Sequence, residues 1–229
     1  MGTLYALGVG PGDPDLMTVK ARRILGQAPT IIATSRRPGR PSYALELALP
    51  FLDQTRQQVK ILPFPAAGGW DGYTDSIVGW LRAGDVAFLT EGDPLLYSSF
   101  IGVLPGLKQR QAKVCVVPGV ASPMAAAAAA GLPLADDDQR LAILPAMYAL
   151  DVLPQTLSAF HTLVLLKVAP VLEPVLDCLE ALGLGDRAVH VRRVGRPEQT
   201  LLVGSQAIRS APAEVTSDYF SLLLVVSRV

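Results

Sequence analysis

A short apolar run that ends in an acidic, glycine-containing turn constrains this chain more than any other stretch. Residues 86–89 read Val-Ala-Phe-Leu, and the turn Glu91-Gly92-Asp93-Pro94 follows almost at once. An unbroken apolar run of this length predicts a strand that is buried on both faces. Gly92 allows a ligand or a second chain segment to approach, and Pro94 favours the first position of a helix. Asp93 could cap that helix or accept a hydrogen bond from a ligand.

Apolar strand candidates alternate with helical stretches through the amino-terminal half of the chain. Because they are apolar throughout rather than at every second position, they predict a mostly parallel sheet with helices on both faces. Thr18 is expected to cap a helix that runs to about Leu25, and residues 68–72 are expected to form a turn. The predicted strands are 4–10, 30–34, 59–62, 86–89 and 114–117, and further helices are predicted at 42–52, 73–81 and 98–109.

The pattern changes at Pro118-Gly119, after which the chain is richer in strands. A helix of small residues is predicted at 121–130, and only two later helical stretches, about 151–159 and 171–182, separate the strand candidates. This predicts a second, mixed sheet, and hence an α/β chain of two domains, 1–118 and 119–229. The strand candidates of the second domain are 141–144, 162–166, 188–191, 199–203 and 220–226.

Charge and apolar content exclude several classes of partner. The 229 residues include 20 basic and 20 acidic side chains, a balance that gives no general attraction to nucleic acid or to anionic lipid. No unbroken apolar run is as long as a membrane span requires, and the amino-terminal residues lack the pattern of a secretion signal. We therefore expect a cytoplasmic protein with no nucleic-acid or membrane partner.

Cysteine and histidine are too few and too scattered to predict a disulfide framework or a metal centre. Cys115 and Cys178 lie far apart in apolar contexts, so buried free thiols are expected rather than a disulfide. His161 and His190 have no cysteine or carboxylate cluster near them with the spacing of metal ligands. No metal site is predicted.

The glycine-rich segment after the first strand invites comparison with dinucleotide-binding loops. Residues 8–13 read Gly-Val-Gly-Pro-Gly-Asp, so the third glycine of the G-x-G-x-x-G pattern is replaced by Asp13. Pro11 stiffens the turn that should wrap a pyrophosphate, and no acidic residue lies about twenty positions further on to hold a ribose. The loop could still hold a ligand, but in a different way.

Three motifs together resemble the tetrapyrrole methylase family, the S-adenosylmethionine-dependent methyltransferases of corrin and sirohaem biosynthesis. They are residues 8–21, the Gly92-Asp93-Pro94 turn, and Val117-Pro118-Gly119-Val120-Ala121-Ser122 leading to 130–134. Within the family, residues 85–100 and 196–199 most resemble the branch that methylates C20 of precorrin-2 or of its cobalt form, in cobalamin biosynthesis. The resemblance covers nearly the whole chain.

This resemblance implies two α/β domains with a cofactor cleft between them, a homodimer, and a tetrapyrrole substrate. It also implies S-adenosylmethionine as methyl donor and S-adenosylhomocysteine as product. The cofactor-binding residues that it implies are Pro11, Glu91, Gly92, Asp93, Leu96, Ala121, Ser122, Lys167, Val194 and Gly195.

Several of these residues also have simpler explanations. Ala121 and Ser122 could merely begin a helix, and Lys167 could be a charge that ends a strand. A general base is needed only to remove a proton after methyl transfer or to assist tautomerisation. Glu91, Asp93 and Tyr97 are the candidates for that role, and the sequence does not choose among them.

An arginine-rich loop follows the second predicted strand. Arg36, Arg37 and Arg40 could bind the carboxylates of a precorrin, because arginine pairs with carboxylate in a bidentate way. The alternative is a solvated basic loop.

Other functions remain open at this point. A relative could act on another corrin ring carbon or on the modified histidine of a translation factor, and a non-catalytic module could keep the cleft as a metabolite sensor. The residues do not indicate whether the substrate carries cobalt.

Overall fold

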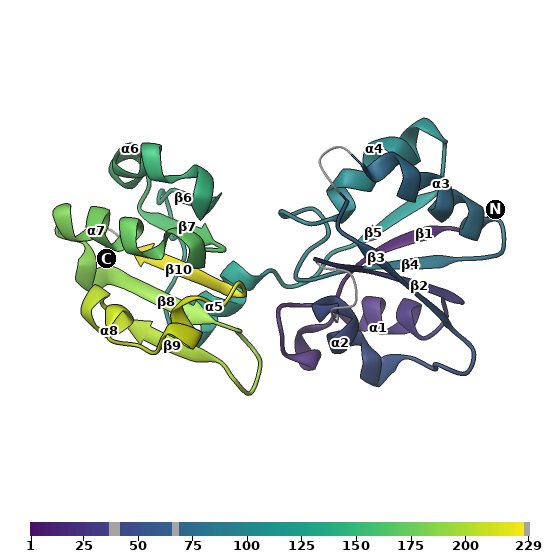
Figure 1. Cartoon of the computed structure of the whole chain (residues 1–229), viewed down its shortest axis with the longest axis horizontal. Coiled ribbons are helices and arrows are strands. Elements are labelled where there is room, and N and C mark those ends of the chain that lie inside the picture. The colour runs from purple at the N-terminus through teal and green to yellow at the C-terminus, as the bar shows by residue number, and fades with distance from the viewer. Residues whose placement is uncertain (37–41, 66–68, 227–229) are drawn as a thin grey trace. The chain divides into compact units, whose positions relative to one another are not determined.

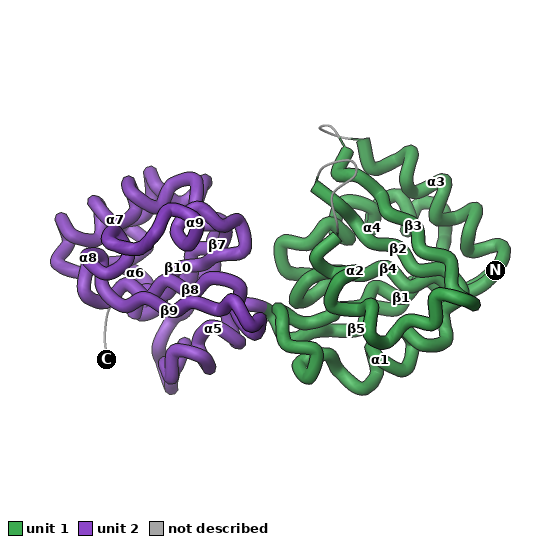
Figure 2. Tube along the Cα trace, turned by 60° about the horizontal axis from the view of Figure 1, so that its bottom comes forward, with its two compact units in different colours: residues 1–121 green, residues 122–229 purple. Residues whose placement is uncertain are grey.

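The computed structural model describes residues 1–36, 42–65 and 69–226. The chain forms two compact units, residues 1–121 (unit 1) and residues 122–229 (unit 2), which Figure 2 colours separately. Each unit is built around one five-stranded sheet.

The sheet of unit 1 is wholly parallel and has the strand order β3-β2-β4-β1-β5. The prediction of a mostly parallel sheet is therefore confirmed. Strand β4 lies at its centre, and all five of its residues are buried, as its unbroken apolar run requires. The strands are β1 (Leu4–Gly8), β2 (Thr30–Ser35), β3 (Gln58–Pro63), β4 (Val86–Thr90) and β5 (Val114–Val117).

Helices cover both faces of this sheet, as predicted. Figure 1 shows α1 and α2 on one face and α3 and α4 on the other. Phe88 of β4 packs against Phe100 of α4, with ring centroids 5.7 Å apart. The Thr18 cap is confirmed, because its hydroxyl accepts the N–H of Ala21 at 3.2 Å. The helices are α1 (Val19–Leu25), α2 (Tyr43–Ala48), α3 (Trp70–Leu81) and α4 (Phe100–Gln109), with the 3-10 turns η1 (Pro14–Leu16) and η2 (Leu49–Phe51).

Two of the predicted elements of unit 1 are wrong. Pro94 begins a turn rather than a helix, since Tyr97 has a φ of 49° that no right-handed helix accommodates. The next helix begins only at Phe100. Residues 70–72 are helical rather than part of a turn, because α3 begins at Trp70, whose ring packs edge-on against Phe64 at 5.5 Å. Residue 68 lies outside the described residues.

The sheet of unit 2 is mixed, as predicted, with the order β6-β7-β10-β8-β9. Strands β6 and β7 are parallel, whereas β10 is antiparallel to both β7 and β8, and β8 is antiparallel to β9. The strands are β6 (Leu141–Pro145), β7 (Thr162–Leu166), β8 (Ala188–Arg192), β9 (Thr200–Val203) and β10 (Ser221–Val226).

Helices of unit 2 pack an apolar core against this sheet, with side chains from α6, α7 and α8 in one cluster. The two short helices α8 and α9 were not expected, because segments of this length show no helical periodicity in a sequence. The helices are α5 (Ser122–Ala130), α6 (Leu153–Ala159), α7 (Leu172–Ala181), α8 (Ser205–Arg209) and α9 (Ala213–Thr216). The 3-10 turns are η3 (Ala146–Tyr148), η4 (Leu150–Val152), η5 (Ala169–Val171) and η6 (Gly185–Arg187).

Both cysteines are free, but each is half-buried rather than buried as expected. Cys115 lies on β5, which is an edge strand with one side unpaired. Burial raises the pKa of the Cys178 thiol. None of the described helices is long and apolar enough to cross a membrane. Among the residues that the structure describes, no three His, Cys, Asp or Glu side chains form a group that could hold a metal ion.

Candidate functional site

The turns after β1, β4 and β5 carry the three sequence motifs. These strands are neighbours in the order β4-β1-β5, and all run in the same direction. Their carboxyl ends therefore meet at one edge, which is where open parallel sheets bind ligands. We call this edge, formed by residues 8–12, 90–97 and 117–121, the unit 1 edge.

Side chains are excluded where these three turns meet. A Cβ atom added to Gly8 would lie 2.5 Å from the carbonyl oxygen of Gly92 and 2.6 Å from the backbone nitrogen of Gly119. Gly92 has a φ of 63°, and its N–H donates to the carbonyl oxygen of Gly10 at 2.8 Å. Gly92 therefore permits the close approach of a second chain segment, which is one of the two roles expected for it.

Asp93 links two of these turns. Its Oδ1 accepts the N–H of Leu95 at 2.8 Å, and its Oδ2 accepts the N–H of Gly119 at 3.1 Å. Asp93 therefore caps a turn rather than the predicted helix. Residues 12–14 are also Gly-Asp-Pro, and there Asp13 Oδ1 accepts the N–H of Asp15, two residues further on, at 2.8 Å. Within the described residues, Asp13 thus repeats the bond between Asp93 and Leu95 but not the bond to a second turn.

The remaining predicted residues of unit 1 differ in exposure. Pro11 and Ala121 are buried, Leu96 is half-buried, and Glu91 and Tyr97 are exposed. Glu91 follows β4 directly, so this residue belongs to the unit 1 edge. The structure thus brings Pro11, Glu91 and the Gly92-Asp93 turn to one edge, where Glu91 and Tyr97 are exposed residues.

The arginine loop is only partly described. Arg36 is exposed just after β2, whereas Arg37 and Arg40 lie outside the described residues. The sequence did not indicate that the hydroxyls of Thr34 and Ser99 would meet at 3.1 Å. This contact joins the end of β2 to the start of α4, and nothing in either segment alone predicts it.

A second group of predicted residues gathers in unit 2. Strands β7 and β8 end where β10 begins, because the N–H of Lys167 donates to the Ser221 carbonyl at 3.0 Å and that of Arg193 to the Phe220 carbonyl at 2.8 Å. Lys167 and Arg193 both have left-handed backbones, with φ of 57° and 47°. We call residues 167, 193–195 and 218–221 the unit 2 edge.

The other predicted residues of unit 2 offer mainly backbone groups. Val194 is buried, and Gly195 has a φ of 78° that favours glycine. The ammonium of Lys167 lies 5.5 Å from the centre of the Tyr219 ring, so its charge has a cation–π partner. Ser122 is the half-buried first residue of α5.

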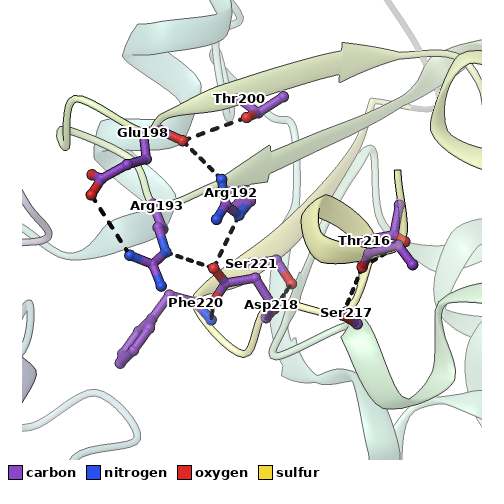
Figure 3. Close-up of polar contacts among 10 residues, drawn as sticks. Arg192, Arg193, Glu198, Thr200, Thr216, Ser217, Asp218, Phe220 and Ser221 are labelled. Atoms are coloured by element: carbon purple, nitrogen blue, oxygen red, sulfur yellow. Dashed lines mark hydrogen bonds and ion pairs between the residues drawn. The ribbon is translucent and has the colours of Figure 1, made fainter. Parts of the chain in front are cut away.

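An ion cluster at the unit 2 edge was missed by the sequence analysis (Figure 3). Asp218 Oδ2 accepts hydrogen bonds from Arg192 Nε at 3.0 Å and from Arg193 Nε at 2.6 Å. Burial alone would raise the pKa of the Asp218 carboxyl, but the hydrogen bonds from Arg193 and Phe220 and the two arginine charges lower it below its usual value. Adjacent arginines are visible in the sequence, but no local signal connects them to a residue so far along the chain.

Two units, one with a wholly parallel sheet and one with a mixed sheet, place the chain in the class of two-domain α/β proteins. Comparison with known proteins identifies the group within that class. The chain belongs to the tetrapyrrole (corrin/porphyrin) methylase family, whose sequence model matches residues 3–207. The resemblance that the three motifs carry is thereby confirmed.

Named relatives in this family include a cobalt-precorrin-2 C(20)-methyltransferase of Salmonella typhimurium. It is 34% identical to this chain over 98% of this chain and 96% of its own length. The cobalamin biosynthesis protein CobIJ of Mycobacterium tuberculosis is 35% identical over 98% of this chain. The present chain spans about half of that longer relative, 46% of its length.

Solved structures share the fold at lower sequence identity. A cobalt precorrin-4 methyltransferase superposes with a TM-score of 0.76 at 22% identity, covering 97% of this chain and 94% of the other. A uroporphyrin-III C-methyltransferase of Thermus thermophilus, in complex with S-adenosylhomocysteine, gives 0.65 at 21% identity over 98% and 92%. The two-unit α/β fold predicted from the sequence is therefore confirmed.

Proposed function

We propose that this protein transfers a methyl group from S-adenosylmethionine to C20 of precorrin-2, or of its cobalt form, in cobalamin biosynthesis. The observation that carries the proposal is the match to the Salmonella C(20)-methyltransferase over nearly all of both chains. Membership of the methylase family and the turn motifs at the unit 1 edge support it.

The residues at the two edges suit this cofactor. S-adenosylmethionine carries ribose hydroxyls, an adenine ring and an amino-acid end. Glu91 is an exposed residue whose carboxylate can accept hydrogen bonds from hydroxyls, and Gly195, with a left-handed backbone and no side chain, lets a ligand approach the main chain. We propose that both edges contribute residues to cofactor binding: Pro11, Glu91, Gly92, Asp93, Leu96 and Ala121 of unit 1, and Ser122, Lys167, Val194 and Gly195 of unit 2.

Placement is the main contribution that the protein would make to the reaction. When bound, S-adenosylmethionine supplies a methyl group already activated on a sulfonium sulfur. The chain must hold the electron-rich bridging carbon of the substrate in line with that methyl and exclude water, and orientation alone supplies several kcal/mol (on the order of 7–11 at most). Rigid turns such as those around Gly8 and Gly119 serve that purpose, because they fix the positions of neighbouring side chains.

A proton must leave the substrate carbon after methyl transfer. Asp93 is a poor candidate to accept it, since both of its carboxylate oxygens already accept backbone N–H groups. Glu91 and Tyr97 are exposed at the same edge and are the better candidates. We therefore do not propose Asp93 as the general base.

The tetrapyrrole carries many carboxylates, for which arginine is the preferred partner. We propose that Arg36, Arg37 and Arg40 bind them. The exposed position of Arg36 just beyond β2, at the same edge of the sheet as the Gly92 turn, supports this assignment.

A cytoplasmic location and a homodimeric state complete the proposal. The free thiols of Cys115 and Cys178 suit a reducing compartment. The equal numbers of acidic and basic residues give no general reason to expect nucleic acid as a partner.

A turnover assay tests the proposal. Purified protein is incubated with S-adenosylmethionine and enzymatically prepared precorrin-2, with and without cobalt, and the tetrapyrrole is weighed by mass spectrometry. We expect a gain of one methyl group and an equal amount of S-adenosylhomocysteine, and the metal requirement will identify the substrate form. Cofactor binding without any gain in mass would contradict the proposed substrate and favour another corrin precursor or a sensor.

A further inference from the structure

The segment that follows β8 is tied at both ends to the Asp218 cluster, which consists of Arg192, Arg193 and Asp218 (Figure 3). Arg193 comes directly before its first residue, and the Asp218 carboxylate accepts a hydrogen bond from the Arg193 side chain. Arg192 Nη1 donates to the carbonyl oxygen of Glu198 at 3.1 Å, near the other end of the segment. We call residues 194–199 the 194–199 loop.

Further hydrogen bonds make this loop a closed turn. The N–H of Gly195 donates to Gln199 Oε1 at 2.7 Å, and the N–H of Gln199 donates to the Arg196 carbonyl at 2.9 Å. Arg196 in turn donates its N–H to the Arg193 carbonyl at 3.0 Å. The loop therefore has a defined conformation, and the side chains of Arg192 and Arg193 link it to Asp218.

Arg193 adopts its left-handed backbone at a cost, because only glycine enters that region freely. Such a conformation persists where the surroundings determine it. The charged hydrogen bond to Asp218 is one restraint of this kind. Since the Asp218 side chain is only 9% exposed, water screens that bond little.

Asp218 also fixes the strand start that contacts Lys167. Its Oδ1 accepts the N–H of Phe220 at 2.9 Å, and its backbone carbonyl accepts the Ser221 hydroxyl at 2.7 Å. The Ser221 carbonyl receives the Lys167 N–H, and the neighbouring Tyr219 ring receives the Lys167 ammonium. One carboxylate thus restrains both parts of the unit 2 edge.

We propose that Asp218 is a positioning residue that holds the 194–199 loop in the conformation that binds the cofactor. The inference rests on the proposed function, because it assumes that Val194 and Gly195 contact S-adenosylmethionine. Asp218 acts on the loop through Arg192 and Arg193. Its loss should therefore weaken cofactor binding and leave the affinity for the tetrapyrrole unchanged.

The test is the affinity of the Asp218→Asn variant for S-adenosylhomocysteine, measured by calorimetry. If only a tenth of the molecules keep a competent loop, the apparent dissociation constant rises roughly tenfold. The Michaelis constant for S-adenosylmethionine should rise in parallel and that for the tetrapyrrole should not. Asp177→Asn is the control, because it also removes one carboxylate charge from an arginine of unit 2, Arg209 on α8, and should bind the cofactor as wild type.

A second variant guards against misfolding of the first. Arg193→Gln removes one partner of Asp218 and keeps the Arg192 ion pair, so it should fold and also bind the cofactor more weakly. In both variants, backbone amides of the 194–199 loop should exchange hydrogen faster than in wild type without cofactor, and those of Asp177→Asn should not.

The outcomes separate the two proposals. Suppose that wild-type protein binds S-adenosylhomocysteine and that Asp218→Asn and Arg193→Gln bind it with an affinity within about twofold of wild type. That result would overturn this inference and leave the proposed function standing. An equal loss of affinity for S-adenosylhomocysteine in Asp177→Asn would overturn this inference as well. Wild-type protein that fails to bind the cofactor would contradict the proposed function, and with it the cofactor role of the loop.

Discussion

The carboxylate of Asp93 accepts the backbone N–H of Gly119 at 3.1 Å, so that one side chain joins the turn after β4 to the turn after β5. Strand β1 lies between those two strands in the sheet. The bond therefore spans the strand whose own turn carries Gly8, and the three motifs form one unit.

Replacing Asp93 with alanine should destabilise the protein more than the same change at Asp13. Both variants lose the local bond to the residue two positions on, but only Asp93→Ala also loses the bond to Gly119. A part-buried N–H left without its partner costs about 1–3 kcal/mol. Urea denaturation of the two variants measures the difference, and equal losses of unfolding free energy would show that the bond to Gly119 contributes nothing.

Gly8→Ala should prevent unit 1 from folding normally. The added Cβ would meet the backbone of two other segments, which cannot move aside as a flexible side chain could. Gly79→Ala is the control, because Gly79 lies within α3 with open space around it and should gain roughly 0.5–1 kcal/mol of helix stability. Thermal denaturation and soluble yield report both effects. A Gly8→Ala protein with a wild-type melting temperature would refute the packing described for the three turns.

The double variant Arg36→Ala, Arg37→Ala should raise the Michaelis constant for the tetrapyrrole and leave cofactor affinity unchanged. The reason is the loss of charged partners for substrate carboxylates. Steady-state kinetics with either substrate varied measures this, and Arg23→Ala, an exposed change on α1, controls for loss of positive charge. An unchanged constant for the tetrapyrrole would remove these arginines from the substrate site.

His190 should make the protein less stable as the pH falls from 6.5 towards 4. Burial, with the charge of Arg192, lowers the pKa of His190 to about 4, although Asp218 opposes the shift. In the unfolded chain this histidine binds a proton below pH 6.5, whereas in the folded chain it does so only near pH 4. The free energy of unfolding is therefore largest above pH 6.5 and has fallen by about 3 kcal/mol at pH 4.

Urea denaturation at several pH values between 7 and 4 measures this loss. His190→Leu should abolish most of it, because leucine does not titrate. The variant should still fold, because no described residue gives either ring nitrogen a hydrogen bond that the change would break. His161→Gln should keep it. A His190→Leu variant with the wild-type pH dependence would show that another group is responsible. Asp218 is not that group, because its pKa is also lowered and its protonation affects stability only below pH 3.8, the pKa of an ordinary aspartate.

Much of the fold could be predicted because burial on both faces leaves a clear trace in the sequence. The run at 86–89 is apolar at every position and became the central strand of a parallel sheet. The helix cap at Thr18 could be predicted because a capping residue and the N–H group that it accepts lie within one turn of the chain. The helix predicted to begin at Pro94 is wrong because that prediction also used only local preference. The left-handed backbone at Tyr97, three residues later, prevents a helix there.

The candidate site was less predictable, because its contacts join distant segments. Asp93 and Gly119 are separated by a helix and a strand, and Asp218 meets Arg192 and Arg193 only because β10 pairs with β8. A sequence shows that such residues are polar or small but not which of them meet. The family motifs placed residues at both edges without indicating the Asp218 cluster.

The position of the transferred methyl group tests the central claim most directly. Precorrin-2, with and without cobalt, is methylated using S-adenosylmethionine labelled with carbon-13 at its methyl group, and the product is examined by nuclear magnetic resonance. We predict one labelled methyl group, attached to the C20 bridge of the macrocycle. A label on any other ring carbon would contradict the proposed function and would show that this chain methylates a different position of the macrocycle.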